Sequence, residues 1–242
     1  MKPPLGRCLL RLFTVQGSWN YERMLGIGFG VAAEPLLRGL PPEDYRPAVA
    51  RGAHFFNAHP YLCGMAVGAA ARAEHDGVPA EQVERLRTAL CGPLGSLGDR
   101  LVWAGWLPLN SGLALVGIAL GMGWWAVAGF LALYNIGHVS LRWWALRAGW
   151  THGLRVVDAL RDPLLRRAGA FLAPAMAAAM GAALPLAVGY LGGPFPGWAR
   201  LLLGGAVAAG VLLLRWRALG LTGLRLGLGF AAIGLVVASV WR

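Results

Sequence analysis

The longest uncharged run in the sequence, residues 101–141, limits the folds open to this chain. Its forty-one residues contain no Asp, Glu, Lys or Arg. A helix needs about 20 apolar residues to cross a bilayer, so this run predicts two crossings joined by a turn. Gly121-Met122-Gly123 supplies the turn, and the pairs Trp124-Trp125 and Trp143-Trp144 suit the two membrane–water interfaces.

The composition of the whole chain favours a membrane protein. Of the 242 residues, 57% are hydrophobic and 14% are charged, whereas a soluble domain has about 25% charged residues. The net charge of +11 does not indicate nucleic-acid binding, because the arginines lie at the ends of apolar runs and not in a stripe with aromatic residues. Cys8, Cys63 and Cys91 are scattered without metal-binding spacing, so we expect no disulfide framework, metal or other cofactor.

A second uncharged segment, residues 53–71, contains an amide, two histidines and Pro60 in its first half. Proline lacks an N–H, so a helix should stop or kink near His59 and leave backbone carbonyls free. Within a membrane, such backbone occurs only where protein buries it or where it lines a cavity, and a broken helix of this kind predicts the solute site of a transporter. The alternative is a soluble core helix with a proline kink.

Polar residues near the N-terminus allow two interpretations. Residues 1–23 are basic and amphipathic, which predicts a helix lying on the membrane surface or on a partner subunit. Asn20 and Glu22 precede an apolar run and could simply cap a helix. Glu34 lies beside the helix breaker Pro35, either as an exposed interfacial carboxylate or as one held at a helix break inside the fold.

The segment Cys91–Arg100 is rich in glycine and precedes the long uncharged run. Three glycines and a proline predict a non-regular, closely packed backbone that re-enters the membrane, since the lysine of a phosphate-binding loop is missing. Asp99 either marks the interface or belongs to the solute pathway. The charged residues of 72–87 predict a helix with a solvated face.

These patterns predict an all-α integral membrane protein with about five transmembrane helices. Residues 1–100 form amphipathic and broken or re-entrant helices on the cytoplasmic side, 101–141 form a two-span hairpin, and 169–242 form three further spans. Residues 142–168 carry six arginines against two aspartates and form a cytoplasmic loop by the positive-inside rule. The N-terminus is then cytoplasmic and the C-terminus outside.

Three segments carry a family resemblance. GSWNYERMLGIGF (17–29), HFFNAHPYLCG (54–64) and GPLGSLGDRLVWAGWLPL (92–109) are similar to the IID component of the mannose-family sugar phosphotransferase system, or PTS. The resemblance implies an inner-membrane subunit that pairs with a IIC subunit to translocate a hexose, while cytoplasmic IIA and IIB proteins carry the phosphohistidines and phosphorylate the sugar. It also implies a higher-order oligomer and no catalytic or phosphorylation site on this subunit.

The candidate sugar-binding residues are led by Asn57 and His59, which either donate to sugar hydroxyls or hold the broken helix together. Weaker candidates for the same cavity are Asn20, Glu22, Glu34 and Asp99. The chain departs from the family pattern at Leu25, Ala58 and Arg100. Two alternatives therefore remain: an orphan IID-like structural or regulatory protein without transport, and a membrane enzyme that uses Asp99 and a histidine as acid and base.

Overall fold

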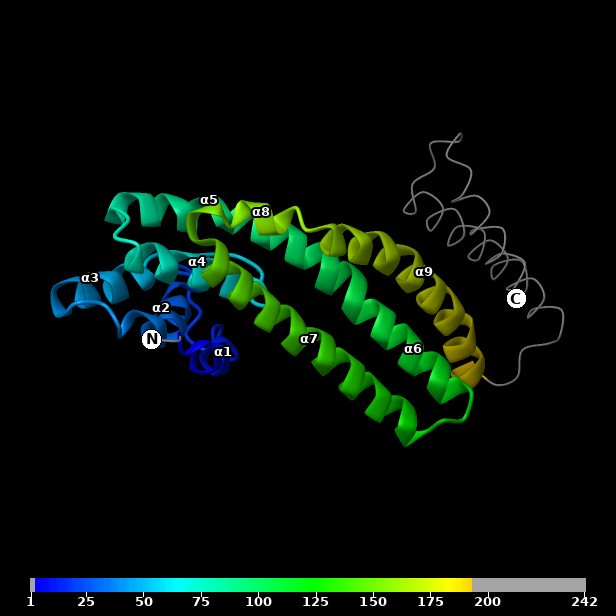
Figure 1. Ribbon diagram of the computed structural model, residues 1–242. Helices are drawn as coiled ribbons and strands as arrows, with labels where there is room; N and C mark the ends of the chain where they lie inside the picture. The colour runs from blue at the N-terminus through cyan, green and yellow to red at the C-terminus, as the bar shows by residue number, and fades with distance from the viewer. Residues whose placement is uncertain (1–2, 193–242) are drawn as a thin grey trace. The chain divides into compact units, whose positions relative to one another are not determined.

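The computed structural model describes residues 3–192, and these residues are helical without a strand. The predicted all-α fold is confirmed for this part of the chain. The helices are α1 (Leu5–Leu12), α2 (Gly26–Leu37), α3 (Pro42–Gly52), α4 (Cys63–His75), α5 (Ala80–Gly98), the π-helix η1 (Asp99–Trp106), α6 (Leu107–Ala119), α7 (Trp124–His152), the 3-10 turn η2 (Gly153–Arg155), α8 (Val157–Leu160) and α9 (Pro163–Gly192) (Figure 1).

The chain divides into two units, Met1–Met180 and Gly181–Arg242. The first unit contains α1 to α8 and most of α9. The predicted turn after Gly193 and the two last predicted spans, Leu201–Leu214 and Leu219–Trp241, lie outside the described residues.

The predicted turn at Gly121-Met122-Gly123 is confirmed. Helix α6 ends at Ala119, α7 begins at Trp124, and the two glycines have φ angles of 85° and 53°. These positive values are strained for residues with a side chain. Figure 1 shows the two helices running side by side and antiparallel away from this turn.

The glycine-rich segment before the hairpin is helical, so the predicted non-regular backbone is wrong. Helix α5 continues through Pro93 to Gly98, and the only departure from α-helical geometry follows at η1. Gly98 is needed for close packing and not for a turn. A Cβ at this position would lie 2.2 Å from the Cβ of His59. Gly92 and Gly95 have open space around them.

Helices α4 and α7 form the tightest contact of the core. Gly64 and Gly68 are spaced four residues apart on α4, and a Cβ at Gly68 would lie 2.5 Å from the carbonyl oxygen of Leu146 on α7. On α7, a Cβ at Gly149 would lie 2.0 Å from the carbonyl oxygen of Met65. Small residues at this spacing allow two helix backbones to approach closely.

Helix α7 extends beyond the uncharged run to His152, so the first part of the predicted basic loop is helical. Arg142 is buried in α7, and the helix ends where Gly153 has a φ of 52°. Only the residues after this glycine leave the long helix.

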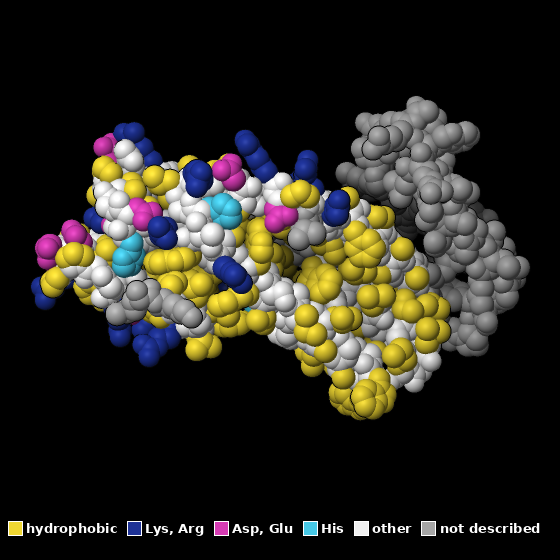
Figure 2. Space-filling model, viewed as in Figure 1, with side chains coloured by type: hydrophobic (Ala, Val, Ile, Leu, Met, Phe, Trp, Pro, Cys, Tyr) yellow, Lys and Arg dark blue, Asp and Glu magenta, His cyan; other side chains and the backbone are white. Residues whose placement is uncertain are grey.

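Two stretches among the described residues are long and apolar enough to cross a membrane, Ala80–Ala119 and Val157–Leu184. At 1.5 Å per residue, the first is about 60 Å long, which exceeds the hydrocarbon thickness of a bilayer twofold. Figure 2 shows hydrophobic side chains covering α6 and α7 toward their turn, while charged side chains gather over α2 to α5 and near α8.

Candidate functional site

The three motif segments of the sequence meet at one loop, residues 53–62, which we call the central loop. The backbone N–H of Leu25 donates to the carbonyl of Phe56 at 2.8 Å, and the N–H of Phe56 donates to Arg23 at 3.3 Å. These bonds join the first motif to the second. The third motif reaches the central loop through the close contact between Gly98 and His59.

The predicted helix break at Pro60 is confirmed. The chain leaves helix α3 at Gly52 and starts α4 only at Cys63. The carbonyl of His59 accepts from the N–H groups of Leu62 and Cys63, both at 3.0 Å. The carbonyls of Gly52, His54 and Pro60 accept from arginine side chains, and no backbone N–H among the described residues donates to them.

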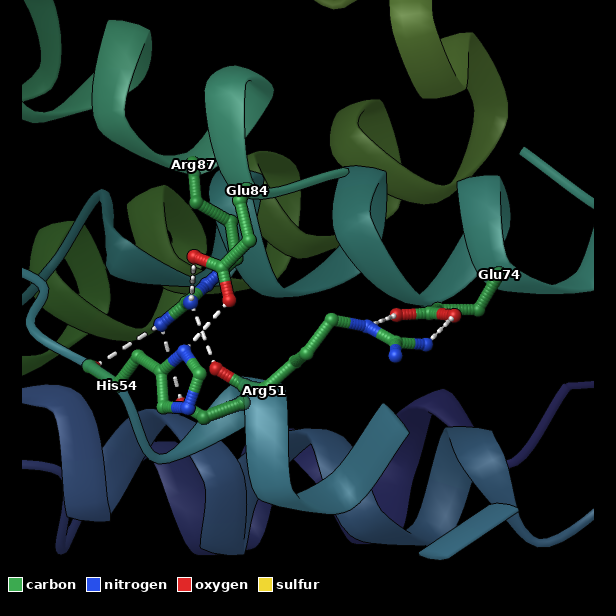
Figure 3. Close-up of polar contacts among 6 residues, drawn as sticks. Arg51, His54, Glu74, Glu84 and Arg87 are labelled. Carbon is green, nitrogen blue, oxygen red and sulfur yellow. Dashed lines mark hydrogen bonds and ion pairs between the residues drawn. The ribbon is translucent and has the colours of Figure 1, made fainter. Parts of the chain in front are cut away.

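Arg87 of α5 holds the start of the central loop (Figure 3). Its side chain is 1% exposed, and it donates to the carbonyls of Arg51 at 2.6 Å, Gly52 at 3.2 Å and His54 at 3.1 Å. These carbonyls lie at and just beyond the C-terminus of α3, where a helix leaves acceptors without partners. The guanidinium also lies 4.6 Å from the ring centre of Phe29. Arg87 thereby binds α5 to the end of α3.

Two ion pairs surround this contact (Figure 3). Arg51 binds Glu74 of α4 through two hydrogen bonds of 2.9 and 2.6 Å. Glu84 of α5 accepts from Arg87 at 3.1 Å and contacts Nδ1 of His54 at 2.6 Å. The start of the central loop is therefore fixed to α3, α4 and α5 by a connected polar network.

Arg142 of α7 holds the other end of the central loop. Its guanidinium donates to the carbonyls of Pro60 at 3.2 Å and of Leu12 at 2.5 Å, and its Nε donates to Nε2 of His138 at 2.9 Å. The guanidinium also lies 4.7 Å from the ring centre of Tyr61. One side chain thus joins α7 to the end of α1 and to the proline break.

An aromatic cluster lies beside Arg142. The Tyr61 and Tyr134 hydroxyls are 2.7 Å apart, and the Tyr61 ring stacks on His138 with a centroid distance of 4.4 Å. His59 packs against Trp103 of η1 at 5.2 Å. Its Nδ1 accepts from the N–H of Tyr61 at 3.2 Å, which assigns the ring proton to Nε2, and Nε2 is buried with no hydrogen-bond partner in residues 3–192. Within this part of the chain, the cluster therefore contains an imidazole donor without an acceptor.

The predicted site residues divide into two groups. Asn57 and His59 lie two residues apart in the central loop, where Asn57 is exposed and His59 is buried. Asp99 directly follows Gly98, which packs against His59. Asn20 and Glu22 lie just before Arg23 and Leu25, the residues whose backbone groups bond to Phe56 of the central loop. The Oδ1 of Asn20 accepts from the N–H groups of Glu22 at 3.1 Å and Arg23 at 2.9 Å, so it shapes a turn, while Glu22 is exposed.

Glu34 belongs to a separate cluster on α2. Its carboxylate binds Arg11 of α1 at 2.6 Å, Arg38 at 2.5 Å and Tyr45 at 2.9 Å. Partial burial raises the pKa of this carboxyl, but the hydrogen bonds from Arg38, Tyr45 and Arg11 outweigh it and hold the pKa below its ordinary 4.5. The contacts hold Glu34 within the fold, but α2 continues through Pro35 to Leu37, so the predicted helix break beside Glu34 is not present.

Sequence reasoning did not find Arg87 and Arg142. It placed Arg87 on a solvated face and Arg142 at the start of a loop, whereas both are buried. Val83 and Leu90 are also buried, and they lie four residues before and three after Arg87. This spacing puts Arg87 on the same face of the helix as the apolar residues, and it was the available signal that the arginine is buried. Within residues 3–192, no three His, Cys, Asp or Glu side chains gather where they could hold a metal ion.

The fold has solved counterparts in membrane proteins. A chain described as "Structure of membrane protein" matches with a TM-score of 0.67 at 23% identity, covering 99% of this chain and 98% of that one. A chain of the cryoEM structure of the mannose transporter ManYZ in complex with microcin E492 matches with a TM-score of 0.59 at 23% identity, covering 99% and 97%. At this identity the likeness defines the fold.

Sequence comparison defines the family. The model of the PTS system mannose/fructose/sorbose family IID component matches residues 2–185. The chain belongs to this family. The mannose-specific EIID component of Escherichia coli K12 is 28% identical over 170 residues, or 65% of this chain and 58% of that protein. The sorbose-specific EIID component of Klebsiella pneumoniae is 32% identical over 169 residues, or 65% and 60%. The chain thus matches less than two thirds of the length of these relatives.

Proposed function

We propose that this chain is the IID membrane subunit of a mannose-type PTS permease. With a IIC partner it forms the pathway that translocates a hexose, and the cytoplasmic IIA and IIB proteins phosphorylate that hexose. Family membership supports the class of protein. The names of the relatives, which specify mannose, sorbose and fructose, support a hexose as the solute.

The observation that carries this proposal is the meeting of three motif segments at the central loop. Asn57 is exposed there, so its amide is accessible to a solute or to a partner subunit. His59, two residues later, is buried, and its Nε2–H has no hydrogen-bond partner among the described residues; Asp99 follows Gly98, which packs against His59. Amide, imidazole and carboxylate groups are suitable hydrogen-bond partners for sugar hydroxyls. We assign the solute contact to Asn57 and the support of the loop to His59.

The proposal includes the arrangement in the membrane. The α6–α7 hairpin crosses the inner membrane twice, α9 begins the next crossing, and the whole chain makes about five. Residues 1–100 and the basic segment after Gly153 lie on the cytoplasmic side, since arginines concentrate there. On this arrangement the C-terminus is outside, and paired IIC–IID units assemble into a higher-order oligomer.

Co-purification tests the proposal. The chain is co-expressed with the IIC subunit from the same organism, the complex is isolated in detergent, and binding of radiolabelled mannose, glucose and N-acetylglucosamine is measured. We expect a stable complex that binds one of these sugars, and we expect Asn57→Ala to weaken binding about tenfold or more without loss of the IIC subunit, since a lost hydrogen bond to a sugar leaves a polar group unpaired.

Asn135→Ala is the matched control. Asn135 is an exposed amide on α7 whose one side-chain hydrogen bond within the described residues is to its own helix, at the carbonyl of Leu131. Its removal should leave sugar binding unchanged. A chain that associates with no IIC subunit would contradict the transport proposal and favour the orphan protein. A complex that keeps full sugar affinity after Asn57→Ala would contradict only the assignment of Asn57.

A further inference from the structure

A groove lies between α1 and α2, far along the sequence from the central loop. It has a volume of about 350 Å³ and is lined by three arginines and two apolar residues, Arg7, Leu10, Arg11, Pro35 and Arg38. The volume lies within the range of small-ligand sites, which is about 300–1,000 Å³. The lining combines positive charge with apolar surface.

Pro35 explains how the groove is built. Because proline has no N–H, the carbonyl of Val31 lacks the hydrogen bond that it would receive within a regular helix. Arg11 of α1 donates to this carbonyl at 2.9 Å and binds the neighbouring Glu34 at 2.6 Å. The Arg11 side chain of α1 therefore fixes the contact between the two helices by donating to the carbonyl that Pro35 leaves without a partner in α2.

The groove has an excess of positive charge. Glu34 is the carboxylate in contact with these arginines, and it binds both Arg11 and Arg38. Arg7 is exposed and makes no ion pair among the described residues. Three positive charges thus face one negative charge, which leaves a net charge of two for a ligand to neutralise. Figure 2 shows basic side chains grouped at the edge of the molecule where α1 and α2 lie.

Apolar side chains border the same groove. Leu10 lines the groove and is 69% exposed, although Cys8 and Leu12 on the other face of the same helix are fully buried. A short helix with one face in the core and with leucine and arginine on its open side is suited to the boundary between lipid headgroups and acyl chains.

We propose that this groove binds the headgroup phosphate of an anionic phospholipid. Arg7 and Arg38 contact the phosphate, Arg11 remains bound to Glu34 and Val31, and Leu10 contacts the acyl chains. Arginine matches phosphate with paired donors, and the surplus charge favours an anionic over a zwitterionic lipid. The exposed leucine favours a lipid over a soluble phosphate. The site is independent of the sugar pathway.

Non-denaturing mass spectrometry of the full chain in a mild non-ionic detergent tests this site. The protein is titrated with phosphatidylglycerol or with phosphatidylcholine of the same acyl chains, and the dissociation constant of the first bound lipid is measured. We expect phosphatidylglycerol to bind at least about tenfold more tightly. The double variant Arg7→Gln/Arg38→Gln should abolish that difference, because each basic residue near an anionic lipid contributes roughly fivefold.

The chain supplies a matched control in Arg46→Gln/Arg85→Gln. Arg46 is exposed without an ion pair among the described residues, like Arg7, and Arg85 binds Glu81 four residues earlier, as Arg38 binds Glu34. This variant loses the same charge and should keep the lipid preference. The single variant Arg7→Gln removes a side chain on which no described contact of the fold depends, and it should lose about fivefold.

Equal affinity for the two lipids would overturn the proposal, and so would a preference that survives the double variant. If inorganic phosphate displaces phosphatidylglycerol at equal concentration, the groove binds soluble anions and the lipid assignment is wrong. If the double variant leaves lipid binding unchanged but weakens retention of a co-expressed IIC subunit, the groove contacts a protein partner, which also contradicts the proposal.

Discussion

Two buried arginines, Arg87 and Arg142, have the same chemical role at opposite ends of the central loop. Each donates to carbonyl oxygens where a helix ends or where a proline interrupts the backbone. A buried charge is tolerated only when several hydrogen bonds satisfy it, and each guanidinium makes several, although Nε of Arg87 has no partner among the described residues. Lysine has the charge but not the planar set of five donors, so it could not replace either residue.

Arg87→Met should destabilise the protein by about 3 kcal/mol, because it leaves the carbonyls of Gly52 and His54 without a donor. For a chain of this size that lowers Tm by roughly 6 to 12 °C. The measurement is thermal unfolding in detergent followed by tryptophan fluorescence. Arg85→Met is the control: Arg85 lies two residues away and its side chain is 75% exposed, so its loss should change stability little. Equal effects of the two changes would refute the role assigned to Arg87.

Glu34 predicts a pH dependence. Its pKa is lower in the folded than in the unfolded protein, so its contribution to stability is present above the unfolded pKa of about 4.5 and is lost as pH falls through the folded pKa. Glu34→Gln should therefore lower Tm at pH 7, and the difference from wild type should shrink below about pH 4.5. The measurement is Tm of both proteins between pH 7 and pH 3. A difference that stays constant over this range would contradict the assignment.

At the scale of elements, the contact between α5 and the central loop depends on Gly98. Gly98→Ala would place a methyl group 2.2 Å from the Cβ of His59, so helix and loop must separate. We expect a loss of about 1–3 kcal/mol, measured as a fall in Tm. Gly95→Ala, one turn earlier with nothing within 4 Å, should leave Tm equal or raise it slightly. A lowered Tm for both variants would indicate a general requirement for glycine in α5 and not this contact.

The elements that could be predicted from the sequence are those with local causes. The turn at Gly121-Met122-Gly123 and the break at Pro60 follow from backbone conformations that only a few residue types favour, and both are confirmed. The expectation from the glycines of 91–98 was wrong, because the helix is continuous there: Gly98 permits a close contact with His59, while Gly92 and Gly95 have open space around them. Local composition does not distinguish a glycine needed for a turn from a glycine needed for a contact.

At the scale of the whole molecule, the proposed topology is testable by labelling. With Cys8, Cys63 and Cys91 replaced, a single cysteine is introduced at Met122 or at Arg155, both of which are exposed. The charge pattern predicts that a membrane-impermeant maleimide labels Met122→Cys in intact cells and Arg155→Cys only after permeabilisation. The reverse result would invert the proposed orientation, and labelling of both in intact cells would contradict the hairpin.

The candidate site was predictable in part. The sequence motifs identify Asn57, His59 and Asp99; the structure has Asn57 and His59 in one loop and Asp99 next to Gly98, which packs against His59. Their role in sugar binding stays a prediction. The backbone bonds between the first two motifs and the positions of Arg87 and Arg142 depend on contacts between segments up to 130 residues apart, as in the bond from Arg142 to Leu12. No local pattern specifies which distant carbonyl a buried guanidinium will reach.

The single guanidinium of Arg142 also determines which parts of the protein should open together. It holds both the last turn of α1, through Leu12, and the proline break, through Pro60. Displacement of this side chain would free both segments at once, so we expect them to belong to one cooperative unit of local unfolding. Amide hydrogens at residues 12–15 and 61–63 should therefore exchange with solvent at a common rate, although almost fifty residues separate them along the chain.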